Sequence, residues 1–271
     1  MARLCWQLVV RRSVWRISYM QKSKETIDVK SQLGSQKPTR TPPVGIELYY
    51  GAVAEANRSS AGSVSDVVSE EERSTADRFK FERDRLRYLA TRRMVRNLLS
   101  KYADIEPDAW KFETNEFGKP SIDPEQYAGL YFNVSHTSST IVCAVAIFPH
   151  IGVDIEDQIH SDYHEVATRF FANDEQEWLR AAESVQDESA RFLAIWTLKE
   201  AYIKAVGKGL TIPLTSFSVF PHHERWFAVE NDGKEERWSF RKYFVGDSTI
   251  AVVFPNRFES MTCHLREFAI D

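Results

Sequence analysis

The segment Gly152–Glu156 (GVDIE) alternates strictly between small or apolar residues and acidic ones. Side chains alternate across a strand, so Val153 and Ile155 are expected on one face and Asp154 and Glu156 on the other. Two carboxylates about 7 Å apart on one face repel each other. A strand of this kind buries one face in a core and needs a compensating charge on the other, and a hard divalent cation such as Mg²⁺ supplies it. The plain alternative is a solvated strand end.

A second charged element is the helix predicted over residues 190–206. At 100° per residue, its apolar positions form one stripe, which comprises Phe192, Ile195, Trp196, Tyr202, Ile203 and Val206. Lys199 falls near the middle of this stripe, where an ammonium group needs an anionic partner. Glu200 and Lys204, four residues apart, are neighbours along its edge. An exposed Glu–Lys pair explains these two but not Lys199, so the helix favours a site that binds phosphate and a metal ion.

The remaining elements mix helices and strands without a regular βαβ cadence or a G-x-G-x-x-G turn. A helix is predicted to start after Ser69, which is followed by three glutamates, and others span residues 83–102 and 169–182. Strands are predicted over residues 45–53, 130–134, 140–148, 217–220, 226–230, 238–245 and 249–254. Residues 115–120 form a turn. This pattern predicts an α+β fold, not a doubly wound parallel sheet.

Charge and cysteine content restrict the function and the compartment. The 271 residues carry a formal net charge of −4, which argues against a nucleic-acid or membrane-surface partner. No run of about 18 apolar residues exists, so no transmembrane helix is expected. The three cysteines are widely separated, which predicts a reducing compartment such as the cytoplasm, with neither disulfides nor a zinc site.

The N-terminal region differs from the rest of the chain. Six basic residues precede Glu25, and residues 30–43 are polar and contain three prolines. Residues 1–43 are therefore predicted to be a basic, disordered extension and linker. An organelle transit peptide, a tail, and an over-long start with Met20 as the true one remain open.

Five motifs occur together in a fixed order. They are G-K-P at residues 118–120, F-N-V-S-H-T at 132–137, G-V-D-I-E at 152–156, R-F-F with Glu175 from 169, and W-x-x-K-E-A-x-x-K-x-x-G-K-G-L at 196–210. In combination, over about residues 47–254, they resemble the surfactin-type (Sfp-type) 4'-phosphopantetheinyl transferases. The resemblance implies that family's fold, with two similar α/β halves related by pseudo-two-fold symmetry and the site at their interface. The halves would be residues 44–150 and 151–271, in a monomer that is a pseudo-dimer.

The resemblance also implies the reaction. The 4'-phosphopantetheine arm of coenzyme A would move to a serine of an apo acyl or peptidyl carrier protein, releasing adenosine 3',5'-bisphosphate. Asp154, Glu156 and Glu200 would bind Mg²⁺ on the pyrophosphate of coenzyme A, and Glu200 would also be the general base. Lys204 would be catalytic, and would neutralise or protonate the transferring and leaving phosphates. This agrees with the physics of phosphoryl transfer, which depends on positioning and charge stabilisation.

Further coenzyme A contacts are implied by the same motifs. They would come from Arg87, Lys119, Ser135, His136, Asp154, Lys199 and Lys204. Arg92, Arg93 and Arg96, on the helix that carries Arg87, are expected on a solvated face. One departure is that Glu72 and Thr75 stand where some relatives have lysines, which leaves nucleotide contacts from that segment in doubt.

Three other functions are less consistent with the same residues. A basic-helix nucleic-acid binder lacks both a basic net charge and a recognised motif. A Mg²⁺-dependent kinase or nucleotidyl transferase lacks a Walker loop and a kinase glycine loop. A catalytically silent relative is disfavoured because all three metal ligands and Lys204 are retained. The sequence leaves open which carrier and pathway are served, and whether acyl-coenzyme A is tolerated.

Overall fold

The computed structural model describes residues 41–53, 67–157, 162–220, 226–231 and 234–270. The predicted basic extension, with its alternatives of a transit peptide, a tail or a false start, therefore lies almost wholly outside the described residues. No helix in the described part of the chain is long and apolar enough to cross a membrane.

The first sheet is mixed, with the strand order β10-β1-β5-β4, and three of its four strands come from the first half of the chain. Its strands are β1 (Ile46–Ala52), β4 (Tyr131–His136), β5 (Thr140–Ala146) and β10 (Cys263–Glu267). Helices α3 (Glu70–Ala76) and α4 (Glu82–Leu99) precede the short hairpin of β2 (Phe112–Thr114) and β3 (Pro120–Ile122). The helix α4 packs on one face of the sheet, where Met94 and Leu98 contact a core that includes Ile141 and Val145.

The second half forms an antiparallel sheet with the strand order β6-β9-β8-β7. Its strands are β6 (Gly152–Glu156), β7 (Trp226–Asn231), β8 (Lys234–Val245) and β9 (Ser248–Pro255). The helices are α5 (Tyr163–Phe170), α6 (Asn173–Arg180) and α7 (Val185–Val206). The apolar stripe of α7 covers one face of this sheet, where Ile195, Leu198 and Tyr202 join a core with Ala251 and Val253.

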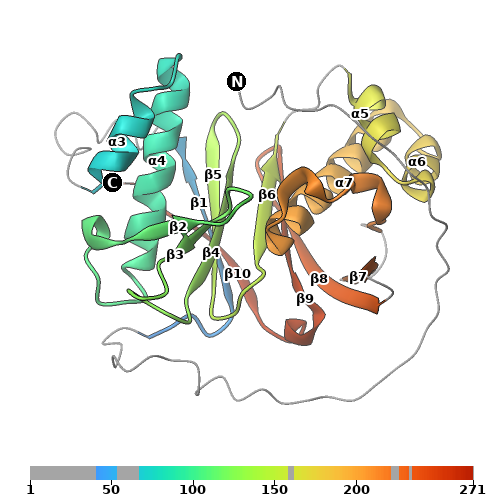
Figure 1. Cartoon of the computed structure of the whole chain (residues 1–271). Coiled ribbons are helices and arrows are strands. Elements are labelled where there is room, and N and C mark those ends of the chain that lie inside the picture. Colours follow the sequence, from blue (N-terminus) through green and yellow to red (C-terminus); the bar gives the residue numbers. More distant parts are fainter. Residues whose placement is uncertain (1–40, 54–66, 158–161, 221–225, 232–233, 271) are drawn as a thin grey trace.

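The two sheets face each other in the middle of the molecule. Alternate residues of β1 and β5, such as Leu48 and Val142, pack against Val153, Ile155 and Val252 of the second sheet. The order of layers is thus α4, first sheet, second sheet, α7, as Figure 1 shows. This is the mixed helix-and-strand arrangement that the sequence predicted.

Local signals placed most elements correctly, and the helix prediction over residues 169–182 was wrong. Ser69 caps α3 through a capping box with Glu72, as the sequence indicated. The segment 169–182 instead contains the end of α5 and all of α6, with the extended Phe171 between them. The break is stabilised because Glu175 accepts a hydrogen bond from the backbone N–H of Ala172 at 2.8 Å. The following helix α7 also begins earlier than predicted, after Ser184, whose side chain accepts from the N–H of Asp187.

Residues 217–220 were predicted as a strand and form none. Phe217 and Val219 are buried, which explains the strand-like pattern. Their backbone groups are satisfied by side chains and not by a neighbouring strand: Lys199 donates to the carbonyl of Phe217, and Glu175 accepts from the N–H of Val219.

The strand β10 was not predicted, and neither were β2 and β3. The chain returns after β9 to place β10 parallel to β1, with Ile46 opposite Cys263 and Tyr50 opposite Glu267. The last strand of residues 151–271 therefore belongs to the sheet of the first half. This register depends on a strand more than 200 residues away along the chain, which no local pattern encodes.

Candidate active site

The site lies at the seam between the two facing sheets, where an edge strand of each sheet contacts the other. Strand β4 of the first sheet lies beside β6 of the second. Asn133 on β4 accepts a hydrogen bond from the backbone N–H of Val153 on β6, at 2.8 Å. The predicted orientation of β6 is confirmed, since Val153 and Ile155 are in the central core. Asp154 on the opposite face points toward α7 and is buried, with 3% of its surface exposed.

Asp154 is the centre of a three-residue cluster from three elements. Its Oδ1 accepts from the hydroxyl of Ser135 on β4 at 2.7 Å and from Nζ of Lys204 on α7 at 2.6 Å. The ammonium of Lys204 also donates to the Ser135 oxygen at 2.8 Å. The sequence predicted Ser135 at the nucleotide end, whereas the structure places it within this cluster.

Glu156 and Glu200 add two carboxylates to the same region. Burial, followed by the charge of Asp154, raises the pKa of Glu156 to about 7. Burial and then Asp154 likewise raise the pKa of Glu200 to about 7. Glu156 is oriented by Trp196, whose indole N–H donates to Oε1 at 3.1 Å. Two acids with raised pKa values beside the buried carboxylate of Asp154 need a positive charge to compensate them.

Lys204 supplies part of that charge. Burial alone lowers its pKa, but the carboxylates of Asp154, Glu200 and Glu156 outweigh this effect, so the pKa of Lys204 is raised. The ammonium therefore stays charged throughout the physiological range. A permanently charged lysine between acidic side chains can bind a phosphate oxygen that enters the site.

The donor set fits a hard divalent cation in its chemistry. Oδ2 of Asp154 is buried and has no hydrogen-bond partner among the described residues, which is costly unless something binds it. Carboxylate oxygens are the ligands that Mg²⁺ prefers. Among the described residues, however, no three His, Cys, Asp or Glu side chains already stand at the spacing of a metal-ligand set.

Lys199 does not lie with this cluster, and the expectation that it contacts phosphate is wrong. Its side chain has no exposed surface. Its Nζ forms a 2.8 Å ion pair with Glu175 of α6 and donates to the carbonyls of Leu214 and Phe217, both at 2.6 Å. These three contacts use all three hydrogens of the ammonium. The sequence argument that Lys199 needs an anionic partner holds, but that partner is a carboxylate of the protein.

Some of the residues predicted to bind the nucleotide lie close to the acidic cluster, and others do not. Burial lowers the pKa of His136, and the positive charges of Arg87 and Lys204 lower it further, which places both cations within electrostatic reach of the imidazole. Arg87 is held by Asp84 at 2.8 Å. Lys119 instead donates from Nζ to the carbonyls of Ile151 and Ala205, both at 3.1 Å. Burial lowers the pKa of Lys119 to about 8.

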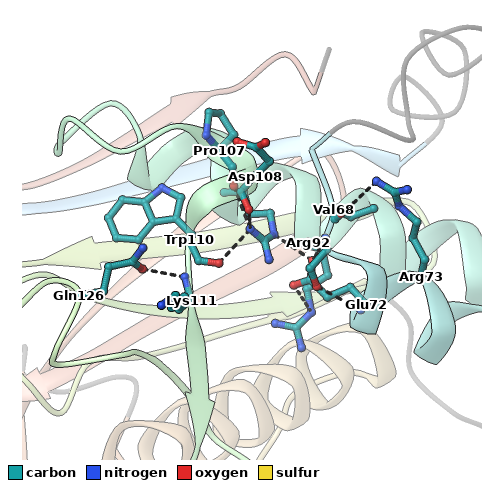
Figure 2. Close-up of polar contacts among 11 residues, drawn as sticks. Val68, Glu72, Arg73, Arg92, Pro107, Asp108, Trp110, Lys111 and Gln126 are labelled. Atoms are coloured by element: carbon teal, nitrogen blue, oxygen red, sulfur yellow. Dashed lines mark hydrogen bonds and ion pairs between the residues drawn. The ribbon is translucent and has the colours of Figure 1, made fainter.

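The helix that carries Arg87 is anchored through Glu72. The guanidinium of Arg96, buried in the core, donates to Glu72 at 2.9 Å and to the carbonyls of Pro107, Asp108 and Trp110. Figure 2 shows this network, with Arg92 also facing Glu72. The glutamate found where some relatives have a lysine thus joins α3 to α4. The expectation of a solvated face was wrong for Arg93 and Arg96, which are both buried.

Two residues of the site were missed by sequence reasoning. Asn133 and Trp196 were assigned only to a motif and to the apolar stripe, yet they hold β6 to β4 and orient Glu156. The position of Asn133 between the apolar residues Phe132 and Val134 was the available signal. For Trp196, nothing in the periodicity shows that its N–H faces β6.

Comparison with known families agrees with this geometry. Residues 150–253 match the model of the 4'-phosphopantetheinyl transferase superfamily, and residues 56–147 match a model described as 4'-phosphopantetheinyl transferase, N-terminal. The first match contains β6 and α7, and the second contains α4 and β4.

Curated relatives carry the same activity in their names. The 4'-phosphopantetheinyl transferase gsp of Aneurinibacillus migulanus is 32% identical over 191 residues, which are 70% of this chain and 78% of the relative. Sfp of Bacillus subtilis strain 168 is 35% identical over 163 residues, 60% of this chain and 70% of Sfp. HetI of Nostoc sp. is 38% identical over 146 residues, 53% of this chain and 61% of HetI. With both halves matched, the chain belongs to the Sfp-type 4'-phosphopantetheinyl transferase family and is a transferase of phosphopantetheine.

Proposed function

We propose that the protein transfers the 4'-phosphopantetheine arm of coenzyme A to a serine of an apo acyl or peptidyl carrier protein, with Mg²⁺ as cofactor. The observation that carries this proposal is the cluster at the seam. Lys204 and Ser135 are bound to Oδ1 of Asp154, Oδ2 is without a partner in the described structure, and Glu156 and Glu200 are acids with raised pKa values. Phosphoryl transfer needs such a concentration of metal-binding and cationic groups.

Asp154, Glu156 and Glu200 would hold the Mg²⁺ ion on the pyrophosphate of coenzyme A. When bound, the ion neutralises phosphate charge and orients the phosphates. The buried position of Asp154 and the indole contact to Glu156 support this assignment, because each holds one of the two carboxylates in a fixed position.

Glu200 would take the proton of the carrier serine, either directly or through a water. Glutamate carboxylates serve as general bases in this way. A new bond forms between the serine oxygen and the phosphorus that carries the pantetheine. The bond from that phosphorus to the bridging oxygen breaks, and adenosine 3',5'-bisphosphate leaves. Lys204, 2.6 Å from Asp154, would stabilise the charge that develops on the phosphate oxygens.

The nucleotide end would contact Arg87 and His136, with Lys119 and Ser135 as further candidates from the family motifs. The charges of Arg87 and Lys204 both act on the imidazole of His136, and two cations near one imidazole support a shared anion site. Arginine binds phosphate through two parallel hydrogen bonds, which suits a 3'-phosphate. Lys199 is not part of this proposal.

We infer that the two halves of the chain are related by pseudo-two-fold symmetry. Each half pairs one sheet with one long helix, α4 or α7, which supports a pseudo-two-fold relation between them. A monomer would then contain one complete site at the seam. The absence of cysteine pairs in the sequence supports a cytoplasmic location.

The test is incubation with coenzyme A, Mg²⁺ and a panel of purified apo carrier proteins, followed by mass spectrometry of the carriers. A carrier that gains one phosphopantetheine supports the proposal, and omission of Mg²⁺ should abolish the gain. If no carrier gains mass across fatty-acid, polyketide, nonribosomal-peptide and aminoadipate-reductase types, the proposed carrier substrate is wrong.

A single variant tests the reaction centre. Glu200→Gln keeps the shape of the side chain but removes the base and a metal ligand, so turnover should fall by a factor of about 100 or more. The matched control is Glu177→Gln, at an exposed position on α6, which should keep full activity. Near-normal turnover in Glu200→Gln would contradict the assignment of the base.

A further inference from the structure

The turn between β2 and β3 belongs to the first half of the chain but ends against the reaction helix of the second. Asn115 at the start of this turn donates from Nδ2 to the carbonyl of Gly207 at 2.7 Å. Its Oδ1 accepts from the backbone N–H groups of Phe117 and Lys119, at 3.0 and 2.9 Å. One side chain therefore both orders the turn and reaches across the seam.

Lys119, at the other end of the turn, makes two more contacts in the same direction. Its Nζ donates to the carbonyl of Ala205, in the last turn of α7, and to that of Ile151, the residue before β6. The side chain also packs closely on the C-cap of α7, since a Cβ added to Gly207 would lie 3.0 Å from its Cδ. A single ammonium group thus joins three segments.

These contacts meet a need of α7 itself. The last carbonyls of a helix have no partner within the helix and carry its partial negative charge. The helix α7 ends at Gly207, which has the left-handed conformation (φ 78°), and the N–H of Gly207 donates to Ile203. Donors from Asn115 and Lys119 satisfy the carbonyls of Gly207 and Ala205, which completes the C-terminal cap with residues from the other half.

The position of α7 relative to β6 decides the geometry of the reaction centre. Glu200 and Lys204 lie on the last two turns of α7, next to the capped end, while Asp154 and Glu156 lie on β6, which starts directly after Ile151. We propose that the turn 115–119 is a positioning element for this centre, in which Asn115 and Lys119 hold the end of α7 against the start of β6. The proposal rests on the proposed function, and it assigns to Asn115 a role that no motif of the sequence suggested.

Asn115→Asp gives the sharpest test. It keeps the Oδ acceptor that orders the turn, removes the donor to Gly207 and places a negative charge at the negative end of α7. We expect kcat to fall roughly tenfold while KM for coenzyme A stays within about twofold of the wild type. Assays are run well below the melting temperature, so that lower global stability alone does not change kcat. The matched control is Glu116→Gln on the exposed part of the same turn, which should leave both constants unchanged.

Hydrogen–deuterium exchange of the protein alone tests the same contact without turnover. The amide of Gly207 and its neighbours at the end of α7 should exchange faster in Asn115→Asp than in the wild type and in Glu116→Gln. Unchanged exchange together with unchanged kcat would overturn the proposal, and so would a rise in KM for coenzyme A with normal kcat, which would make the turn a substrate-binding element. If the wild-type protein modifies no carrier, the proposed function is contradicted. The exchange experiment would still test whether Asn115 holds the end of α7 in place.

Discussion

At the scale of single residues, the site brings acidic side chains together at an electrostatic cost. Burial and the charge of Asp154 raise the pKa values of Glu156 and Glu200, and only Lys204 among the described contacts to Asp154 carries a compensating charge. Such an arrangement lowers the free energy of unfolding of the protein without ligand. Binding of a cation or a phosphate ligand raises it again. The consequence can be measured as a dependence of stability on pH.

Glu156 provides a prediction for this dependence. A folded-state pKa of about 7, against an ordinary value of 4.5, means that the folded protein binds more protons than the unfolded chain between these values. Stability without Mg²⁺ should therefore fall as pH rises from about 4.5 through about 7. Glu156→Gln should raise the melting temperature at about pH 8 and change it little at about pH 4.5. The gain in the free energy of unfolding at the higher pH should not exceed about 3 kcal/mol. Thermal unfolding in a chelator measures this, and a variant less stable at the higher pH would contradict it.

The pair of Lys199 and Glu175 provides a second prediction at this scale. Both side chains are fully buried, so removing one partner leaves an uncompensated charge. Lys199→Met should destabilise the protein by about 3–5 kcal/mol. The double variant Lys199→Met/Glu175→Leu should recover only the part of that loss that comes from the unpaired charge, because the backbone groups bonded by these two side chains still lose their partners. Urea denaturation gives the free energy of unfolding of the single and the double variant. Equal losses in both would show that the ion pair is not the cause.

At the scale of elements, the reaction geometry depends on how closely α7 approaches β6. The contact is made at Gly152, where an added Cβ would overlap the backbone of Ala201 and Ala205 on α7. Glycine is required here for space and not for its backbone conformation.

Gly152→Ala should therefore force α7 away from β6. We expect a loss of several kcal/mol in stability, since backbone atoms cannot yield as a flexible side chain can, and a loss of transferase activity in whatever protein folds. Circular dichroism melting and carrier modification measure the two effects. Gly246→Ala is a control for glycine replacement in open space, because no atom lies within 4 Å of its added Cβ, although its positive φ adds a modest cost. Equal behaviour of the two variants would contradict the close-packing argument.

At the scale of the whole molecule, β10 makes the two halves interdependent. It follows the second sheet in the chain but completes the first, and the residues after it, Phe268 and Ile270, are buried in the core beneath α4. The halves are therefore expected to unfold in one transition.

Removal of residues 262–271 tests this coupling. The truncation deletes all of β10 and two core side chains, so the free energy of unfolding should fall by at least about 4 kcal/mol. The amides of β1 should lose protection from hydrogen exchange, although β1 lies at the other end of the chain. Retained protection in β1 would show that β10 is an independent appendage.

The sequence alone determined the local features of this protein. Alternation placed Asp154 and Glu156 on one face of a strand, the capping box started α3, and the helical period put Lys199 inside an apolar stripe; each is confirmed by the structure. These features could be predicted because strand and helix periods decide which face a residue occupies. The family motifs added the reaction, and the matches to both halves confirm the family.

Only the tertiary structure decided which groups meet. Lys199 pairs with Glu175 and not with phosphate, Ser135 joins Asp154, Lys119 binds the end of α7, and β10 crosses to the first sheet. Each contact joins residues that are separated by at least 19 positions in the chain. A periodic pattern states that a buried lysine or an open helix end needs a partner, but not which of several possible partners folding brings within 3 Å. That choice depends on the packing of the two sheets and α7, which no single segment encodes.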